Sequence, residues 1–191
     1  MSKKTRRVSV SLHPQKSGPL SNEEIKAILR GADDLIMEGG RSLLAKILKG
    51  SKDKTILEKD LTNNPSYGYY KGLSIYEITS KIDWLIINRY LEIEYSGRLP
   101  MLIYSPKGWE IEKDTYTDEI LSGFDRLINI GINSFNMLYL KDRARDMIML
   151  LLDKIQESRD SKYIPILEAW KKVDYKKVRV RIDSVIRALC K

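Results

Sequence analysis

Residues 40–104 change their apolar spacing in an order that restricts the fold to few architectures. Apolar residues recur at helical spacing over residues 43–48 and again over residues 75–86, where Ser74 and Glu77 predict a capping box at the start of the helix. From Leu91 the spacing changes to strict alternation, which predicts a strand, and residues 96–100 predict a turn before a return strand. Two helices followed by a two-stranded hairpin are the order of a winged helix-turn-helix, which mostly serves to bind nucleic acid.

An N-terminal arm and a further helix precede this region. Residues 1–20 hold Ser, Pro, Gly and basic residues without apolar periodicity, which predicts a flexible basic arm. A helix begins after Ser21, whose partner Glu24 completes a capping box, and a pair of glycines ends it. The sequence therefore predicts a winged-helix domain over residues 21–114.

The C-terminal part of the chain is predicted to be helical. Residues 109–125 contain six acids and one lysine, and we interpret them as a domain boundary or an interdomain face, or more simply as a solvated acidic linker. Three apolar faces lie over residues 120–128, 144–155 and 175–189. Paired helices of this kind predict a small helical bundle; two HEAT-like units are the alternative, although no internal repeat is visible. The expected fold class is mainly α with a small β-wing, in which residues 115–191 form a helical C-terminal domain.

The charge distribution indicates a polyanionic partner. The 191 residues carry a net charge of +8. Residues 1–17 contain five Lys or Arg and no acid, and residues 171–191 contain eight against two acids. Such clusters favour phosphate contacts with counterion release. The single cysteine, Cys190, excludes an internal disulfide, and no apolar run approaches the roughly 18 residues of a membrane span. We expect a cytoplasmic protein, with nucleoid association as a further possibility.

Catalytic chemistry has little support in the sequence. His13 is the only histidine and lies in the basic arm, so neither a histidine triad nor a histidine metal site is expected. The acids between Glu110 and Glu119 could bind a divalent ion, but they lack a recognisable metal-ligand spacing. No GxxxxGK[ST] loop is present to hold nucleotide phosphates. We therefore expect a protein without enzymatic activity, cofactor or metal.

Four motifs within residues 22–114 resemble those of the RQC domain, the winged helix that follows the ATPase core in RecQ-type DNA helicases. Residues 49–51 (Lys-Gly-Ser) are similar to the Arg-Gly-Ser that ends a family helix, and residues 67–68 (Tyr-Gly) to its Tyr/Phe-Gly loop. Residues 85–91 resemble the family's Leu-Ile…Gly-Phe/Leu-Leu entry into the wing, and residues 102–108 its Leu-x-Leu-Thr-x-x-Gly exit. The resemblance implies a DNA-binding winged helix, in a chain similar to small bacterial proteins built around a free-standing RQC domain.

The chain departs from the family at positions that matter for unwinding. Arg89 stands where the family usually has glycine before the wing. Leu99 stands near where some members place an aromatic residue or a histidine that separates the terminal base pair. The cysteine cluster of the helicase zinc subdomain is absent. The resemblance, together with the missing nucleotide loop, therefore implies DNA binding rather than strand separation.

The resemblance and the charge pattern nominate a set of DNA-contacting residues. By the resemblance, Lys49 and Ser51 grip a phosphate beside the first N–H groups of the next short helix, which favour an anion; a plain C-cap followed by an N-cap is the alternative. The polar side of the helix after Ser74 can meet the DNA backbone or a groove, and a solvated face is equally expected for any one residue there. The candidate DNA-binding residues are Lys49, Ser51, Lys52, Lys54, Ser74, Tyr76, Thr79, Lys81, Arg98, Leu99 and Lys107.

Two functions are compatible with these features. The favoured one is a non-enzymatic protein that docks a winged helix on duplex or structured DNA through phosphate contacts, in DNA repair, replication or recombination. The arm and the basic last helix would extend its footprint. The alternative is a protein-interaction adaptor, in which the winged helix or the basic C-terminal helix binds an acidic protein partner. A bridging factor, with DNA on the first half and a protein on the second, combines both.

Overall fold

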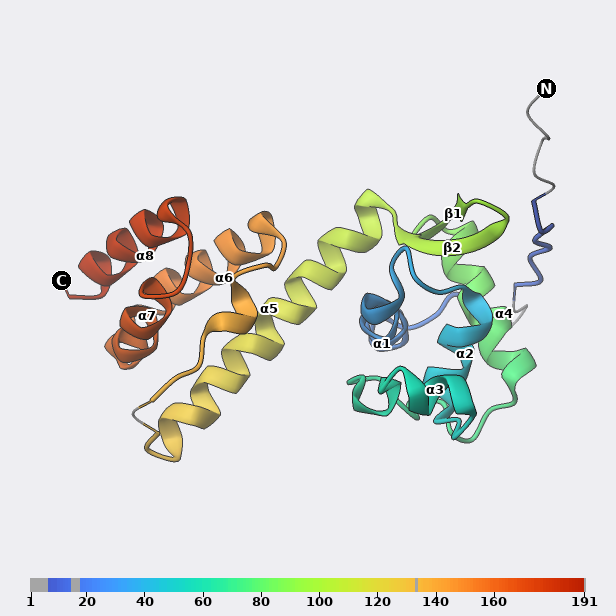
Figure 1. Ribbon diagram of the computed structural model, residues 1–191, viewed down its shortest axis with the longest axis horizontal. Helices are drawn as coiled ribbons and strands as arrows, with labels where there is room; N and C mark the ends of the chain where they lie inside the picture. The colour runs from blue at the N-terminus through green and yellow to red at the C-terminus, as the bar shows by residue number, and fades with distance from the viewer. Residues whose placement is uncertain (1–6, 15–17, 133, 191) are drawn as a thin grey trace, which may run out of the picture. The chain divides into compact units, whose positions relative to one another are not determined.

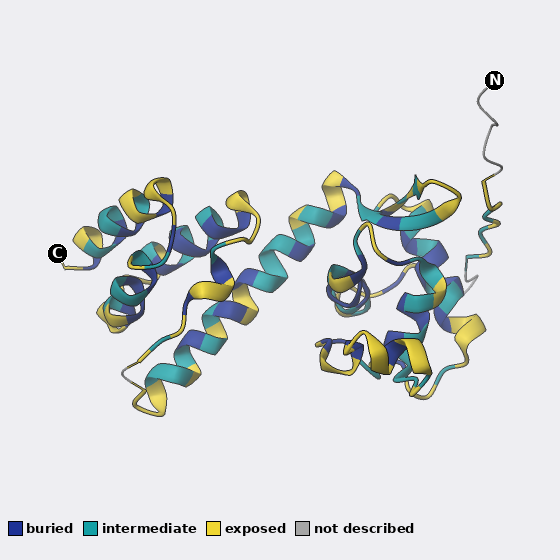
Figure 2. Cartoon of the chain, in the orientation of Figure 1, coloured by how far each residue is buried: buried dark blue, intermediate teal, exposed yellow. Residues whose placement is uncertain are grey.

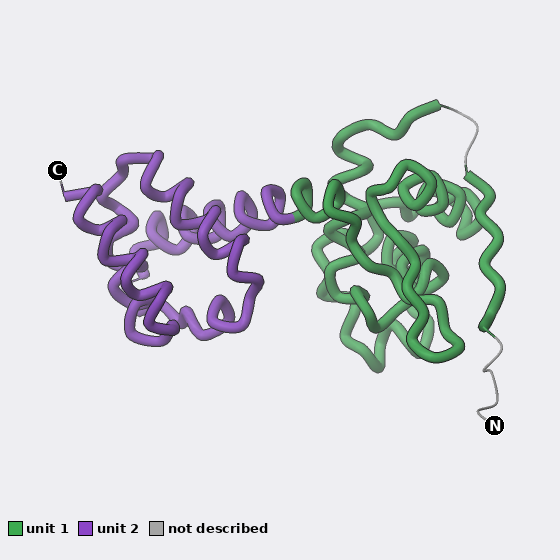
Figure 3. The backbone as a smooth tube through the Cα atoms, turned by 90° about the horizontal axis from the view of Figure 1, so that it is seen from above, with its two compact units in different colours: residues 1–112 green, residues 113–191 purple. Residues whose placement is uncertain are grey.

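The computed structural model describes residues 7–14, 18–132 and 134–190 (Figure 1). The chain divides into two compact units, residues 1–112 and 113–191 (Figure 3). The division falls inside the long helix α5 (Pro106–Asn129), two residues before the boundary expected from the sequence. Mainly helical structure with one small antiparallel sheet confirms the predicted fold class.

The first unit has the element order that the sequence predicts for a winged helix-turn-helix. Both predicted capping boxes are present: Ser21 with Glu24, and Ser74 with Glu77, each begin a helix by reciprocal side-chain and main-chain hydrogen bonds. Short 3-10 turns follow α1 and α3. The bounds are α1 Asn22–Ala32, η1 Asp33–Leu35, α2 Arg41–Lys49, α3 Lys54–Glu58, η2 Leu61–Asn63, α4 Ile75–Ile87, β1 Leu91–Ser96 and β2 Leu99–Tyr104.

The wing is an antiparallel hairpin supported on one side by the segment before α2. Strands β1 and β2 pair from Leu91 opposite Tyr104 to Ser96 opposite Leu99. The amide of Leu102 donates to the carbonyl of Gly39 at 2.9 Å, and the carbonyl of Leu102 accepts from the amide of Met37 at 3.0 Å. Because a lone two-stranded ribbon is marginally stable, this extra pairing helps to fix the wing on the helices.

The core of the first unit is built from the inward faces of α1, α2, α4 and the wing, which Figure 2 shows as buried. Each Leu or Ile that is fully buried there stabilises the fold by about 1.5–3 kcal/mol. Helices α2 and α4 pack directly against each other. The fully buried side chains of these helices and the wing include Ile28, Leu29, Leu44, Ile47, Leu48, Ile78, Ile82, Leu85, Leu91 and Leu102.

The second unit contains the rest of α5 and three further helices. They are α6 (Arg145–Ser158), α7 (Ile164–Lys171) and α8 (Lys176–Leu189), and both α6 and α7 pack on α8. Helix α7 was not predicted, because eight residues with a proline in the first turn give too short an apolar pattern. Its Trp170 is fully buried, as expected for a packing residue.

The interpretation of residues 109–125 as a linker is wrong, because the whole stretch belongs to the helix α5, but the division between the two units does fall within it. Four of its acids, Glu112, Asp114, Asp118 and Asp125, lie beside cations. Glu112 is fully buried and lies 3.6 Å from the guanidinium of Arg30. In the second unit, Lys154 donates to Asp114 at 2.6 Å and to Asp118 at 2.5 Å. Buried apolar residues between the acids, Ile120 and Phe124 among them, belong to the helical face that the sequence predicts over residues 120–128.

Candidate nucleic-acid interface

Two of the family-like motifs meet at the end of α2. Gly50 and Gly68 both have left-handed backbones, with φ of 73° and 76°. A Cβ on Gly50 would lie 3.0 Å from the Cα of Gly68, so the two main chains approach as closely as glycine allows. The amide of Gly68 donates to Ile47 at 2.9 Å, and the hydroxyl of Tyr67 donates to the carbonyl of Ser51 at 2.9 Å. The motifs therefore fix the loop that leads into α4.

Lys49 holds the segment that enters α4. Its ammonium donates to the main-chain oxygens of Lys71 and Leu73, both at 2.7 Å. In these two bonds the carbonyl oxygens accept from Lys49 instead of from water, and the ammonium uses two of its three donors. A structural role therefore accounts for Lys49, and its phosphate contact stays a prediction.

The anion site expected at the start of α3 is already filled by the protein. The carboxylate of Asp53 accepts from the amides of Thr55 at 3.0 Å and Ile56 at 3.4 Å. It also pairs with Lys46 at 2.7 Å, and this ammonium lowers the pKa of the Asp53 carboxyl. Ser51 contributes by accepting a hydrogen bond from the amide of Asp53 at 3.2 Å. The expectation of open N–H groups is thus wrong, because an N-cap carboxylate occupies them.

The polar side of α4 combines structural residues with one uncovered ring. The hydroxyl of Ser74 caps the helix, and that of Thr79 donates back to the carbonyl of Ile75 at 2.8 Å. Lys81 pairs with Glu24 of α1 at 2.8 Å. Tyr76 differs from these, since it is 72% exposed. It is the predicted residue on α4 that is most open to a partner.

The Glu24 carboxylate gives this unit an acid-dependent stability. Burial raises its pKa, but hydrogen bonds from Lys81, the amide of Ser21 and Tyr70 outweigh burial, so its folded pKa lies below the ordinary value of 4.5. A carboxyl with a depressed folded pKa contributes stability above its unfolded pKa, and this contribution is lost as the pH falls through the folded pKa. We expect Tm to fall below about pH 4.5 and Glu24→Gln to flatten that fall, in melts followed by circular dichroism. An equally steep fall in the variant would contradict this assignment.

The wing tip and the wing base carry the remaining predicted residues. Arg98 and Leu99 are exposed at the turn of the hairpin, where Leu99 is 56% accessible. Lys107 lies at the other end, with its ammonium 3.6 Å from the ring centre of Tyr90. That ring stacks on Trp84 with centroids 5.9 Å apart. Lys107 therefore contributes a cation–π contact to the base of the wing.

The described part of the arm contacts the hairpin turn of the wing and α4, which the sequence did not predict. The amide of Val8 donates to the carbonyl of Arg98 at 3.0 Å, and the amide of His13 donates to Asp83 at 2.7 Å. Asp83 is 1% exposed and also pairs with Arg41. Because a buried carboxylate needs such partners, this contact ties the arm, α2 and α4 together.

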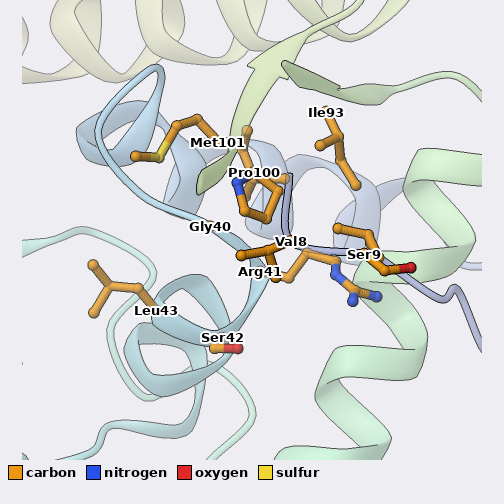
Figure 4. Close-up of a pocket in the computed structure, with 11 residues that line it drawn as sticks. Val8, Ser9, Gly40, Arg41, Ser42, Leu43, Ile93, Pro100 and Met101 are labelled. Atoms are coloured by element: carbon orange, nitrogen blue, oxygen red, sulfur yellow. The ribbon is translucent and has the colours of Figure 1, made fainter. Parts of the chain in front are cut away.

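A groove of about 350 Å³ opens between the arm, the start of α2 and the return strand of the wing (Figure 4). Side chains of Val8, Leu43, Pro100 and Met101 give it mostly apolar walls. Arg41 is the charged residue in its lining, and its guanidinium is engaged by Asp83. The groove therefore offers packing surface rather than catalytic groups.

Three exposed cations near α2 and α4 have no side-chain partner among the residues that the structure describes. Lys52 follows α2, Lys71 precedes α4, and Arg89 follows α4. Lys54, in contrast, forms an exposed pair with Glu58 at 3.4 Å. Lys71 and Arg89 were not nominated from the sequence. Arg89 has a left-handed backbone with φ of 57°, which explains why the family usually has glycine at this position. The replacement of the usual glycine by arginine just before the wing was the sequence signal that could have nominated Arg89.

The described residues contain neither a cluster of metal-ligating side chains nor a helix able to span a membrane. No group of three or more His, Cys, Asp or Glu side chains in these ranges is placed to hold a metal ion. None of the helices described has the length and apolar character needed to cross a membrane.

Comparisons with known proteins agree with the motifs. The family model of the RQC domain matches residues 21–120, which confirms the predicted resemblance. The ATP-dependent DNA helicase RecQ of Bacillus subtilis (strain 168) is 34% identical over 74 residues. The matched part covers 39% of this chain and 12% of that helicase. No solved structure gave a significant match.

Proposed function

The chain belongs to the RQC domain family, and from this premise we propose that its first unit docks on duplex DNA or a structured DNA end, mainly through phosphate contacts. RQC domains are DNA-binding winged helices, which gives the coarse function. The proposal adds the docking mode, the absence of enzymatic activity, and service in DNA repair, replication or recombination. The lack of a nucleotide-binding loop in the sequence supports a binding role.

The observation that carries the proposal is the exposed first turn of α4. The buried side of the whole helix α4 consists of Ile78, Ile82 and Leu85, which are all fully inaccessible. Its open side presents Tyr76 at 72% exposure and Ile75 at 43%. In helix-turn-helix proteins the N-terminal residues of the second helix contact the DNA. An aromatic ring left open at that place favours a nucleic-acid partner over a purely structural role.

Fluorescence anisotropy with blunt duplex, forked duplex and single-stranded DNA tests the proposal. Duplex or forked DNA should bind best, and affinity should fall about a hundredfold between about 50 and 200 mM salt if roughly four phosphates are contacted. Tyr76→Ala should weaken binding about tenfold with little change in the salt slope, because the ring carries no charge. Absence of binding to all three DNAs at low salt would contradict the proposal.

A further inference from the structure

A basic groove lies on the second unit, where the end of α7 meets the start of α8. Its volume is about 420 Å³. Four of the six side chains in its lining are cationic, and they come from both helices and the turn between them. The lining residues are Lys171, Lys172, Lys176, Arg179, Val180 and Asp183.

Most of the positive charge in this groove is not neutralised within the described residues. Lys171 is paired, with Glu168 at 3.2 Å and Asp183 at 2.8 Å. Lys172, Lys176 and Arg179 have no ion pair or side-chain hydrogen bond to any part of the chain that the structure describes. Three cations, one from the turn after α7 and two from the first turn of α8, therefore face an open groove.

The acid nearest in sequence does not compensate for them. Asp174 lies in the turn between α7 and α8 but is only 8% exposed. Its carboxylate accepts from the indole nitrogen of Trp170 at 2.7 Å and from the amide of Tyr175 at 2.6 Å. Both of its oxygens are used by the turn, and Asp174 forms no ion pair with the described cations of the groove.

The placement of the cations opposes the stability of α8 itself. The helix begins at Lys176 and has no acid in its first turn, whereas α1 and α4 begin with Glu24 and Glu77 in capping boxes. Cations near a helix N-terminus interact unfavourably with the helix dipole. Lys176 and Arg179 are also three residues apart, so their like charges share one face and repel. A polyanion in the groove would relieve both costs, whereas a merely solvated face gives no reason to keep them.

We propose that the α7–α8 groove is a second contact surface for the phosphate backbone of duplex DNA. This inference rests on the proposed DNA binding of the first unit and extends it to the second. Phosphate oxygens suit Lys and Arg side chains regardless of base sequence, so the groove adds affinity without sequence preference. Two linked contacts on one chain raise the overall affinity through effective concentration.

The test measures duplex binding of the full chain over a salt series. The variant K172E/R179E changes one cation on each side of the groove. The control R126E/R187E makes the same charge change of the second unit at exposed residues outside the groove. We expect K172E/R179E to bind about tenfold more weakly, with a salt slope lower by about two, and the control to stay within about twofold of the unmodified protein.

A stability measurement separates a binding role from a structural one. Neutralising the start of α8 with K176A/R179A should raise Tm slightly and weaken duplex binding. Equal DNA affinity and salt slope for K172E/R179E and the unmodified protein would overturn the inference, and a groove for an acidic protein would then explain the charge better. If the unmodified protein itself shows no salt-dependent duplex binding, the proposed function of the first unit fails together with the groove inference. If the unmodified protein binds but K172E/R179E binds equally well, the groove inference alone fails.

Discussion

Replacing Gly108 with alanine is expected to lower the free energy of unfolding by about 3 kcal/mol, at the upper end for overpacking. An added Cβ would lie 1.8 Å from the carbonyl oxygen of Tyr90 and 2.8 Å from its carbon. Both are main-chain atoms, so no side-chain rotation relieves the clash. The first turn of α5 would have to move away from Tyr90, the residue just before the wing. Urea unfolding followed by circular dichroism measures the change.

The same contact has a polar part that the substitution would also disturb. The amide of Gly108 donates to the hydroxyl of Ser105 at 3.0 Å. That hydroxyl donates in turn to the carbonyl of Arg89 at 2.6 Å. Ser105 thereby caps α5 and joins it to the end of α4, so a shift of α5 breaks bonds as well as packing.

Gly123→Ala is the matched control, because Gly123 lies in the same helix and an added Cβ would meet nothing within 4 Å. Alanine is the better helix former by about 1 kcal/mol, so this variant should be more stable than the unmodified protein. Opposite signs for the two substitutions would support the close approach at Tyr90. Equal effects of the two substitutions would contradict the close approach, and helix propensity alone would then explain both.

The sequence predicts those parts of the fold that depend on neighbouring residues. The two capping boxes and the hairpin follow from short-range hydrogen bonds and from spacing, and both are present. The motif ending in Gly108 indicated the family, but the reason for its glycine is a contact with Tyr90, eighteen positions earlier, that spacing alone does not show.

The parts that the sequence did not predict depend on pairing between distant residues. Lys49 was nominated for phosphate, yet its ammonium binds two carbonyls 22 and 24 positions away. Asp53 fills the expected anion site because Lys46 and two amides surround it. The arm contacts Asp83 through main-chain groups, which carry no sequence signature. Charge counts can therefore nominate cations, but they cannot distinguish cations bound within the protein from cations that are open to a ligand.

The cations that are not used within the described part of the protein are expected to have a large effect on DNA binding. Lys52, Lys71 and Arg89 are exposed and have no side-chain partner among the described residues. Arg89 also keeps a left-handed backbone, with φ of 57°, that glycine would adopt more easily. Strained conformations that persist are enriched at functional sites, so the retained arginine favours a role in binding. The three residues flank α2 and α4, whose contact forms the helix-turn-helix.

The variant K52E/K71E/R89E is expected to bind duplex DNA about a hundredfold more weakly at 0.1 M salt, with a salt slope lower by about three. Its unfolding free energy should change little, because no internal ion pair is lost. The charge-preserving variant K52R/K71R/R89K should bind nearly as well as the unmodified protein, since a phosphate contact needs mainly the positive charge. Lys49→Ala should behave in the opposite way, with lower stability and a nearly unchanged salt slope. If the triple reversal left the salt slope intact, these cations would not contact phosphate, and DNA binding by the first unit would have to depend on the wing.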